Sequence, residues 1–390
     1  MNLALALAGL AVCASAVAGD LPLPGPDPLG YPLPPIWLQL VSYLTLTLHF
    51  LAMNLTIGSL AIYLWLRATG KRHNERLARY LGSILPLGTS YLITFGVPPL
   101  LFVQVLYGQM FYSSSILIGF HWILVIPLVI FFYGVFYWQK LAKDPGRPGL
   151  VAFSFLAAVA MLAVGFFYVN NITLSFSPER WVDMYRNSPA GHNLNLEEPT
   201  LFARWLLILV PGLTVAGVAI LFRGVLMLKW GWAEEGRHNQ RLAVRVAILG
   251  MVLEAAAGAW TLAMLPHGVR AYVTSGGWPT LLLGLGIVLA GGGIWLIVLG
   301  SNRSSLAFPT LAALALFFAL MPLVALRDLV RLEYLRPHFS LVDIPVNLQW
   351  GMASLFGGFL LMGLGFLAVL HVLVVPKLVA ARRVELDRTS

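Results

Sequence analysis

Beyond residue 13 this chain has no cysteine. Its single cysteine, Cys13, lies in an N-terminal stretch with the features of a secretory signal. The rest of the chain therefore forms no internal disulfide and no thiolate metal site. A Cys-x-x-Cys-His motif is absent as well, which excludes covalent attachment of a c-type haem to this chain.

Charged residues are also scarce. They make up 11% of the 390 residues, whereas 59% are hydrophobic and the mean hydropathy is +0.83. This excludes an ordinary soluble domain, in which about 25% of residues are charged. We expect an all-α, polytopic membrane helix bundle, because a helix needs about 20 apolar residues to cross a bilayer. Nine apolar runs meet this requirement: 37–66, 81–107, 114–138, 149–171, 200–228, 243–265, 277–300, 305–326 and 346–375.

Acidic residues are fewer than basic ones: 16 Asp and Glu stand against 25 Lys and Arg, which gives a net charge of +9. The basic residues gather in the loops after the first, third, fifth and seventh apolar runs and after the last run. The positive-inside rule places these loops in the cytoplasm, the N-terminus outside and the C-terminus inside. Membrane topology thus explains the charge, and a nucleic-acid partner is not needed.

The two ends of the chain differ from the nine-helix domain, which we place at residues 37–376. Residues 1–19 fit a signal peptide, with an uncleaved tenth helix as the alternative. Residues 20–36 form a proline-rich leader that we expect to be extended and external, since proline breaks helices. Residues 377–390 form a basic tail that we expect in the cytoplasm.

Two histidines are candidates for chemistry inside the membrane. His49 lies in the first apolar run, which has no charged residue, and His121 lies near the start of the third. A titratable ring at membrane depth is costly and normally has a partner. A neutral imidazole in a helix bundle is also a usual axial ligand of haem iron. We expect His49 and His121 to ligate a haem b between the first and third helices. The alternative is that each ring hydrogen-bonds a neighbouring group.

Three charged residues complete the candidate site. Glu254 lies deep in the sixth run with no basic residue within a helical turn, so we expect it to handle protons. The alternative is a neutral acid that donates one hydrogen bond. Arg204 and Arg327 lie near the predicted outer face, where either guanidinium can pair with haem propionates. Arg327 falls in an expected outer loop, 327–345.

The segment around His49 resembles a known family. The sequence WLQLVSYLTLTLHFLAMNLTIGSLAIYLWLRATG, residues 37–70, is similar to the first helix of subunit I of cytochrome bd-type quinol oxidases, where a histidine has the same His-Phe-Leu context. The similarity continues through LGTSYLITFGVPPLLFVQVLYGQMFY, FFYGVFYW and AVGFFYVNNITLSFSP, and it covers residues 37–180. The resemblance implies a nine-helix fold, haem and a quinone as the redox partner.

The chain also departs from that family. The paired acidic residues of the family's third helix fall near Gly119 and Pro127, and a haem histidine of its fifth helix corresponds to Arg204. The short segment LPHGVRAYVTSGG replaces the long quinol-binding loop. Of the family's haem ligands only His49 transfers by motif. Oxygen reduction is therefore not expected of this chain.

These observations lead to one functional hypothesis and two alternatives. We expect a membrane subunit of a respiratory complex in a prokaryotic inner membrane. Its haem b would pass electrons between the quinone pool and a c-type cytochrome at the outer face, together with other membrane subunits. One alternative is a haem-free anchor or assembly scaffold of such a complex. The other is a proton-coupled transporter that uses Glu254, although no inverted repeat supports it.

Overall fold

The structure is a computed structural model that describes residues 23–70 and 74–373. The predicted signal peptide and basic tail lie outside these residues. Within the described ranges, nine helical segments are long and apolar enough to cross a membrane. This confirms the all-α, polytopic membrane bundle. We call the end of the bundle at which the first span begins the outer end, following the charge prediction.

The spans agree closely with the apolar runs. Helices satisfy all their internal backbone hydrogen bonds without water, which is the requirement for crossing a bilayer. Four of the helices begin with proline in the first turn, where no backbone donor is needed. The spans are α2 (Pro35–Thr69), α3 (Glu75–Leu117), α4 (Gly119–Leu141), α5 (Pro148–Leu174), α7 and α8 together (Leu201–Leu209 and Pro211–Lys229), α9 (Ala233–Met264), α11 (Trp278–Gly300), α12 (Ala307–Leu335) and α13 (Trp350–Leu373).

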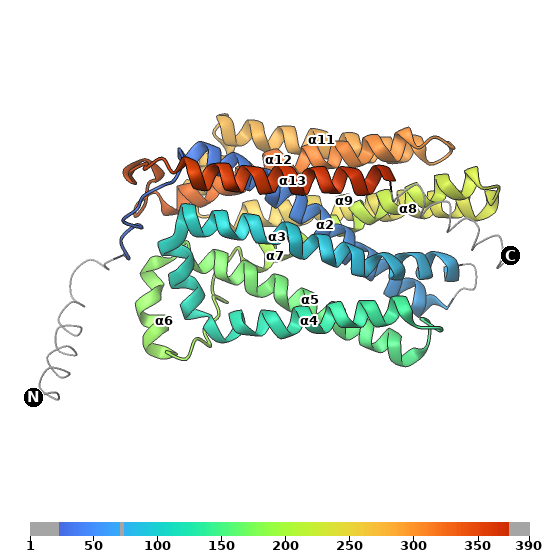
Figure 1. Cartoon of the computed structure of the whole chain (residues 1–390), viewed down its shortest axis with the longest axis horizontal. Helices are drawn as coiled ribbons and strands as arrows, with labels where there is room; N and C mark the ends of the chain where they lie inside the picture. Colours follow the sequence, from blue (N-terminus) through green and yellow to red (C-terminus); the bar gives the residue numbers. More distant parts are fainter. Residues whose placement is uncertain (1–22, 71–73, 374–390) are drawn as a thin grey trace, which may run out of the picture.

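Short helices connect the spans at the outer end. They are η3 (Pro178–Arg180), α6 (Trp181–Asn187), α10 (His267–Thr274) and η4 (Leu341–Asp343). The long helices form layers: α4 and α5 lie on one side, α11 and α12 lie on the other, and α2, α3, α8 and α9 lie between them (Figure 1). The central layer therefore has protein on both sides.

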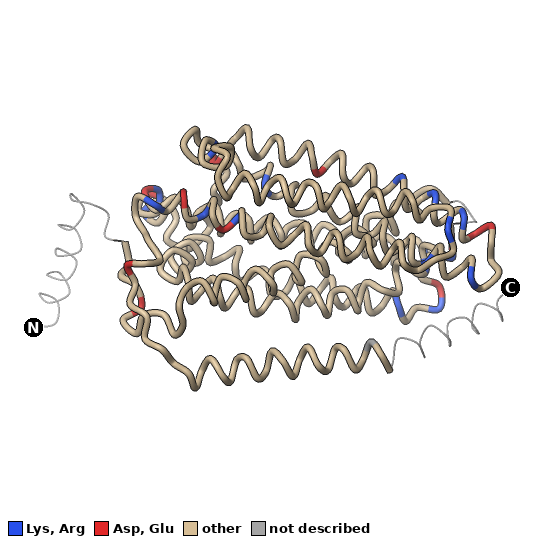
Figure 2. The backbone as a smooth tube through the Cα atoms, turned by 90° about the horizontal axis from the view of Figure 1, so that it is seen from above, with Lys and Arg blue, Asp and Glu red and all other residues tan. Residues whose placement is uncertain are grey.

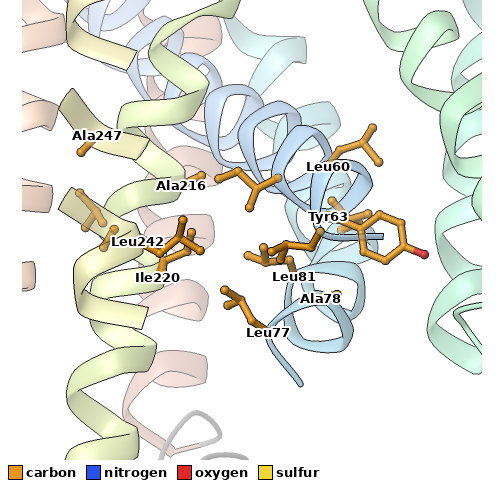
Figure 3. Close-up of a cluster of buried hydrophobic side chains, with 14 of the residues drawn as sticks. Leu60, Tyr63, Leu77, Ala78, Leu81, Ala216, Ile220, Leu242 and Ala247 are labelled. Carbon is orange, nitrogen blue, oxygen red and sulfur yellow. The ribbon is translucent and has the colours of Figure 1, made fainter. Parts of the chain in front are cut away.

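The main apolar core lies where the four central helices meet. Tyr63 of α2, Leu81 of α3 and Ile220 of α8 are fully buried, and Ala247 of α9 packs into the same cluster (Figure 3). Small residues allow these helices to approach closely, which is how membrane helices gain van der Waals contact when lipid is as apolar as the core. This core holds α2, which carries His49, in a fixed position.

The end of α12 differs from the sequence prediction. The eighth apolar run stops at residue 326, and an outer loop was expected over 327–345. α12 instead continues to Leu335, so the first part of that loop is helical. The expectation was wrong because Asp328 and Arg331 are not solvated. They form a buried ion pair of 3.2 Å, so these charges do not end the span.

α3 is the longest helix and contains a break. It spans 43 residues, has Pro86, Pro98 and Pro99 inside it, and departs from helical angles at Tyr107, where φ is −133° and ψ is 30°. Proline removes a backbone donor and crowds the preceding turn, so irregular geometry is expected in such a helix. The second predicted run, 81–107, ends at this break. Beyond it, α3 turns across the outer end and leads to α4 (Figure 1).

The proline-rich leader is attached to the outer end of the bundle. Residues 23–34 contain no helix, and α2 begins at Pro35, two residues before the predicted end of the leader. Tyr31 N donates to Pro345 O at 2.8 Å, and Asn347 N donates to Tyr31 O at 2.9 Å. The Tyr31 hydroxyl donates to Leu106 O at 2.9 Å, beside the α3 break. The leader therefore joins α3 to the segment that precedes α13.

Replacement of Tyr31 by phenylalanine is expected to lower the free energy of unfolding by about 1 kcal/mol, because a buried hydrogen bond to Leu106 O is lost. Burial raises the pKa of the Tyr31 hydroxyl, so it remains a donor at neutral pH. Denaturant titration of the purified protein in detergent measures the change. Tyr185→Phe is the control, since Tyr185 is exposed and no loss is expected there.

α13 packs little against its own bundle. None of its most apolar window is buried, and its ring contact is between Phe356 and Phe102 of α3, at 5.3 Å. Figure 2 shows α13 as the long helix at the lower edge, set apart from the other helices. Its apolar surface therefore faces lipid or another membrane protein.

Candidate functional site

His49 is held in one orientation in the middle of α2. Its Nδ1 lies 2.9 Å from Leu92 O of α3. A carbonyl oxygen only accepts, so Nδ1 carries the proton and, in the neutral ring, Nε2 carries the free lone pair. Gly96 leaves room for the ring, since a Cβ there would lie 2.9 Å from Nδ1. A histidine oriented by a carbonyl at Nδ1 is the usual arrangement of a metal ligand.

The structure does not bring His121 to His49. His121 is the third residue of α4, whereas His49 lies fourteen residues, about 21 Å, along α2. The neighbours of the His121 ring are Phe167, at 5.1 Å between centroids, and His192, at 6.5 Å. The ring that lies beside His49 is that of Phe50, at 5.9 Å between centroids. The third helix begins five residues later than the apolar run indicated, and this moves His121 to the outer end.

No group of three or more histidine, cysteine or acidic side chains is placed to hold a metal ion within the described residues. His121 and His192 are two histidines whose rings lie 6.5 Å apart, and His192 was not a candidate from sequence. His121 Nδ1 is buried without a hydrogen-bond partner, whereas the His192 side chain is exposed. His49 therefore has the better-defined donor geometry of the two predicted ligands.

Glu254 lies beside a small cavity in the bundle. The cavity has a volume of about 20 Å³, and Asn54 of α2 and Thr214 of α8 line it with Glu254 of α9. This space holds about one water molecule and is far too small for a quinone ring. Asn54 Oδ1 is buried without a hydrogen-bond partner, and Glu254 forms no ion pair with any described residue. Apart from these three polar side chains the lining is apolar, and a carboxyl in such surroundings is suited to holding a proton.

Arg204 is fixed at the outer end, in the first turns of α7. Its Nε donates to Thr200 Oγ1 at 2.8 Å, and its guanidinium lies over the rings of Phe176 and Tyr334, at 5.7 and 5.6 Å from their centroids. Nη2 of Arg204 is buried and has no acceptor. Glu197, one of the acids near Arg204 in sequence, pairs with Arg180 instead. Arg204 thus retains an unused donor.

A buried carboxylate beside Arg327 was not identified as a site residue from sequence. Asp328 accepts hydrogen bonds from Gln39 Nε2 at 2.9 Å, Tyr43 at 2.8 Å and Tyr107 at 3.0 Å. Arg331 Nη1 donates to the same carboxylate at 3.2 Å. We call these five residues the Asp328 network. The network joins α2, α3 and α12 at the outer end of the bundle.

Arg327 lies beside this network and has no carboxylate partner among the described residues. Arg331 and Arg204 repel its guanidinium, and Asp328 attracts it. The fold therefore gathers Arg204 and Arg327, which sequence proposed separately, into one group with Arg331. Asp328 faces Arg327 and Arg331, and Glu198 is joined to Arg204 through the Thr200 hydroxyl. The three guanidinium groups therefore outnumber the two carboxylates, and the net charge of the group is positive. The signal available from sequence was the helical spacing of Arg327, Asp328 and Arg331, but it does not show which helices lie opposite.

No known family model matches this chain, and no curated protein matches it.

Proposed function

We propose that this chain is a membrane subunit of a respiratory electron-transfer complex in a prokaryotic inner membrane and that His49 holds a b-type haem. The observation that carries this proposal is the orientation of the His49 ring, whose Nδ1 is used by Leu92 O and whose Nε2 has no partner among the described residues. The donor chemistry of this histidine fits an axial haem ligand. The resemblance of residues 37–70 to an oxidase first helix points to the same residue.

The positively charged group at the outer end fits the haem carboxylates. The Asp328 network reaches α2 at Tyr43, six residues and about 9 Å outward of His49. Arg204 and Arg327 therefore lie on the outer side of the His49 level. Each has a guanidinium without a carboxylate partner within the described residues, and such groups bind carboxylates by two parallel hydrogen bonds. A bound haem would supply one-electron transfer between the quinone pool and a c-type cytochrome at this end.

Glu254 is suited to the proton that accompanies quinone chemistry. Asn54, which lines the Glu254 cavity, lies five residues after His49 on α2, about 7.5 Å further inward. The carboxyl therefore lies on the side of His49 opposite to the arginine group. In this proposal Glu254 accepts and returns a proton, while the quinone itself binds elsewhere because the cavity is too small for its ring.

The proposal is tested by a pyridine haemochrome spectrum of the purified protein. A b-type spectrum is expected from the wild-type chain, and its loss is expected in His49→Ala because the iron loses its axial imidazole. His267→Ala is the matched control, since His267 is exposed in α10 and should leave the spectrum unchanged. A wild-type protein without b haem after expression with added haem would show the proposal to be wrong.

The second candidate is a haem-free membrane anchor of a respiratory complex. The observation that favours it is α13, whose apolar surface is free to contact a second membrane subunit. An anchor needs no ligand at His49. Normal assembly and electron-transfer activity of the complex with His49→Ala would therefore favour the anchor over the haem carrier.

A further inference from the structure

A second cavity lies at the end of the bundle opposite to Tyr31, where the positive-inside rule places the cytoplasm. It has a volume of about 210 Å³ and lies between the last turns of α2 and the first turns of α9. Lys and Arg gather at this end, beyond a middle region with few charges (Figure 2). The cavity is lined by Trp65, Thr69, Asn74, His238, Arg241 and Arg245.

No acidic side chain among the described residues lines this cavity. Arg241 and Arg245 are one helical turn apart on α9, where like charges repel. Both are exposed, and neither forms an ion pair or hydrogen bond within the part of the chain that the structure describes. Glu235 is the acidic residue nearest to Arg241 in the sequence, and its carboxylate is already paired with Arg76 and Arg223. The two arginines are therefore available to an anion.

The α9 surface beyond the arginines is apolar and exposed. Ile248, Leu249 and Val252 follow Arg245 at helical spacing and are 44%, 53% and 59% exposed. Counted along α9, they lie on the same face as Arg241 and Arg245. Trp65, which is 50% exposed, borders the cavity on α2, as expected for a side chain at the membrane interface. The face thus changes from basic to apolar in the direction of the membrane centre.

We propose that this cavity binds the phosphate of an anionic glycerophospholipid of the cytoplasmic leaflet. The phosphodiester pairs with the Arg241 and Arg245 guanidinium groups, and the acyl chains lie along the apolar stripe that begins at Ile248. A free phosphate would use only the arginines. The combination of a basic cavity and an adjoining apolar stripe selects a lipid. This inference is independent of the haem proposal.

The test is native mass spectrometry of the full chain, purified in neutral detergent and incubated with equal amounts of phosphatidylglycerol and phosphatidylcholine. The wild-type chain is expected to retain phosphatidylglycerol preferentially. A basic residue near the membrane surface contributes about fivefold to the binding of anionic lipid, so Arg241→Gln/Arg245→Gln should weaken retention about 30-fold. Lys140→Gln/Lys143→Gln removes the same charge at the same end, away from the cavity, and should retain the lipid.

Two further measurements test the role of the positive charges and distinguish a lipid site from a site for soluble phosphate. Arg241→Lys/Arg245→Lys keeps both charges and should retain most of the preference for phosphatidylglycerol. Added inorganic phosphate should leave the bound lipid in place; its displacement by phosphate would show a site for soluble phosphate and overturn the lipid assignment. Equal retention of the two lipids by the wild-type chain, or unchanged retention by the glutamine variant, would also overturn it.

Discussion

Replacement of Asp328 by alanine is expected to lower the free energy of unfolding by about 3–5 kcal/mol. The change removes the acceptor of four side chains and leaves Arg331 as an uncompensated buried charge. The side chains of both ion-pair partners are less than a tenth exposed, so water does not replace the lost carboxylate. Breaking a buried ion pair by removing one partner typically costs this much, because the remaining charge stays desolvated.

Denaturant titration in detergent measures this loss. Asp343→Ala is the control, since Asp343 is exposed in η4 and its removal should change the unfolding free energy by less than about 0.5 kcal/mol. The double variant Asp328→Leu/Arg331→Leu removes both charges and should recover much of the stability. A loss below 1 kcal/mol for Asp328→Ala would contradict the role of the Asp328 network in joining three helices.

Replacement of Gly58 by alanine is expected to separate α2 from α8 and to cost about 3 kcal/mol or more. A Cβ at Gly58 would lie 1.8 Å from Gly212 O and 2.3 Å from Gly212 C. These are backbone atoms of a helix, so no side-chain rotation can relieve the overlap. Overpacking of a core typically costs about 1–3 kcal/mol, and a rigid backbone contact places this site at the top of that range or above it.

Gly134→Ala is the matched control for the Gly58 variant. Gly134 lies inside α4, and a Cβ there meets no atom within 4 Å. Alanine should therefore be neutral or stabilise the protein by up to about 1 kcal/mol, because glycine is the poorer helix former. Unfolding titrations of the two variants side by side separate close packing from helix propensity. Similar values for both variants would show that α2 and α8 are not in close contact.

The spans themselves could be predicted because crossing a bilayer depends on a local property. About 20 consecutive apolar residues are enough to identify a helix, whatever lies beside it. A run of apolar residues gives the wrong end of a helix where the helix contains charged residues that are paired inside the protein. The end of α12 is such a case, since Asp328 and Arg331 neutralise each other and allow the helix to continue to Leu335. Hydropathy has no means of recognising that pairing.

Less of the candidate site than of the spans could be predicted from the sequence. His49 and Glu254 could be selected because a polar residue in an apolar run is conspicuous. Their partners could not be selected, because Leu92 O and Asn54 are ordinary features of other helices. We expected His49 to pair with His121 only because the two rings were placed at a similar depth in the membrane. α4 begins five residues later than the third apolar run, and this difference places His121 nearer the outer end than His49.

By itself, therefore, the sequence determined the class of protein, the number of spans in the described chain and the histidine that interrupts the first of them. Only the tertiary structure decided which helices are neighbours. It thereby decided that His49 faces α3, that Arg204 joins Arg327 and Arg331, and that a carboxylate at Asp328 fastens three helices. The physical reason is that the transfer of a helix into lipid is decided residue by residue, whereas hydrogen bonds and ion pairs depend on two segments meeting.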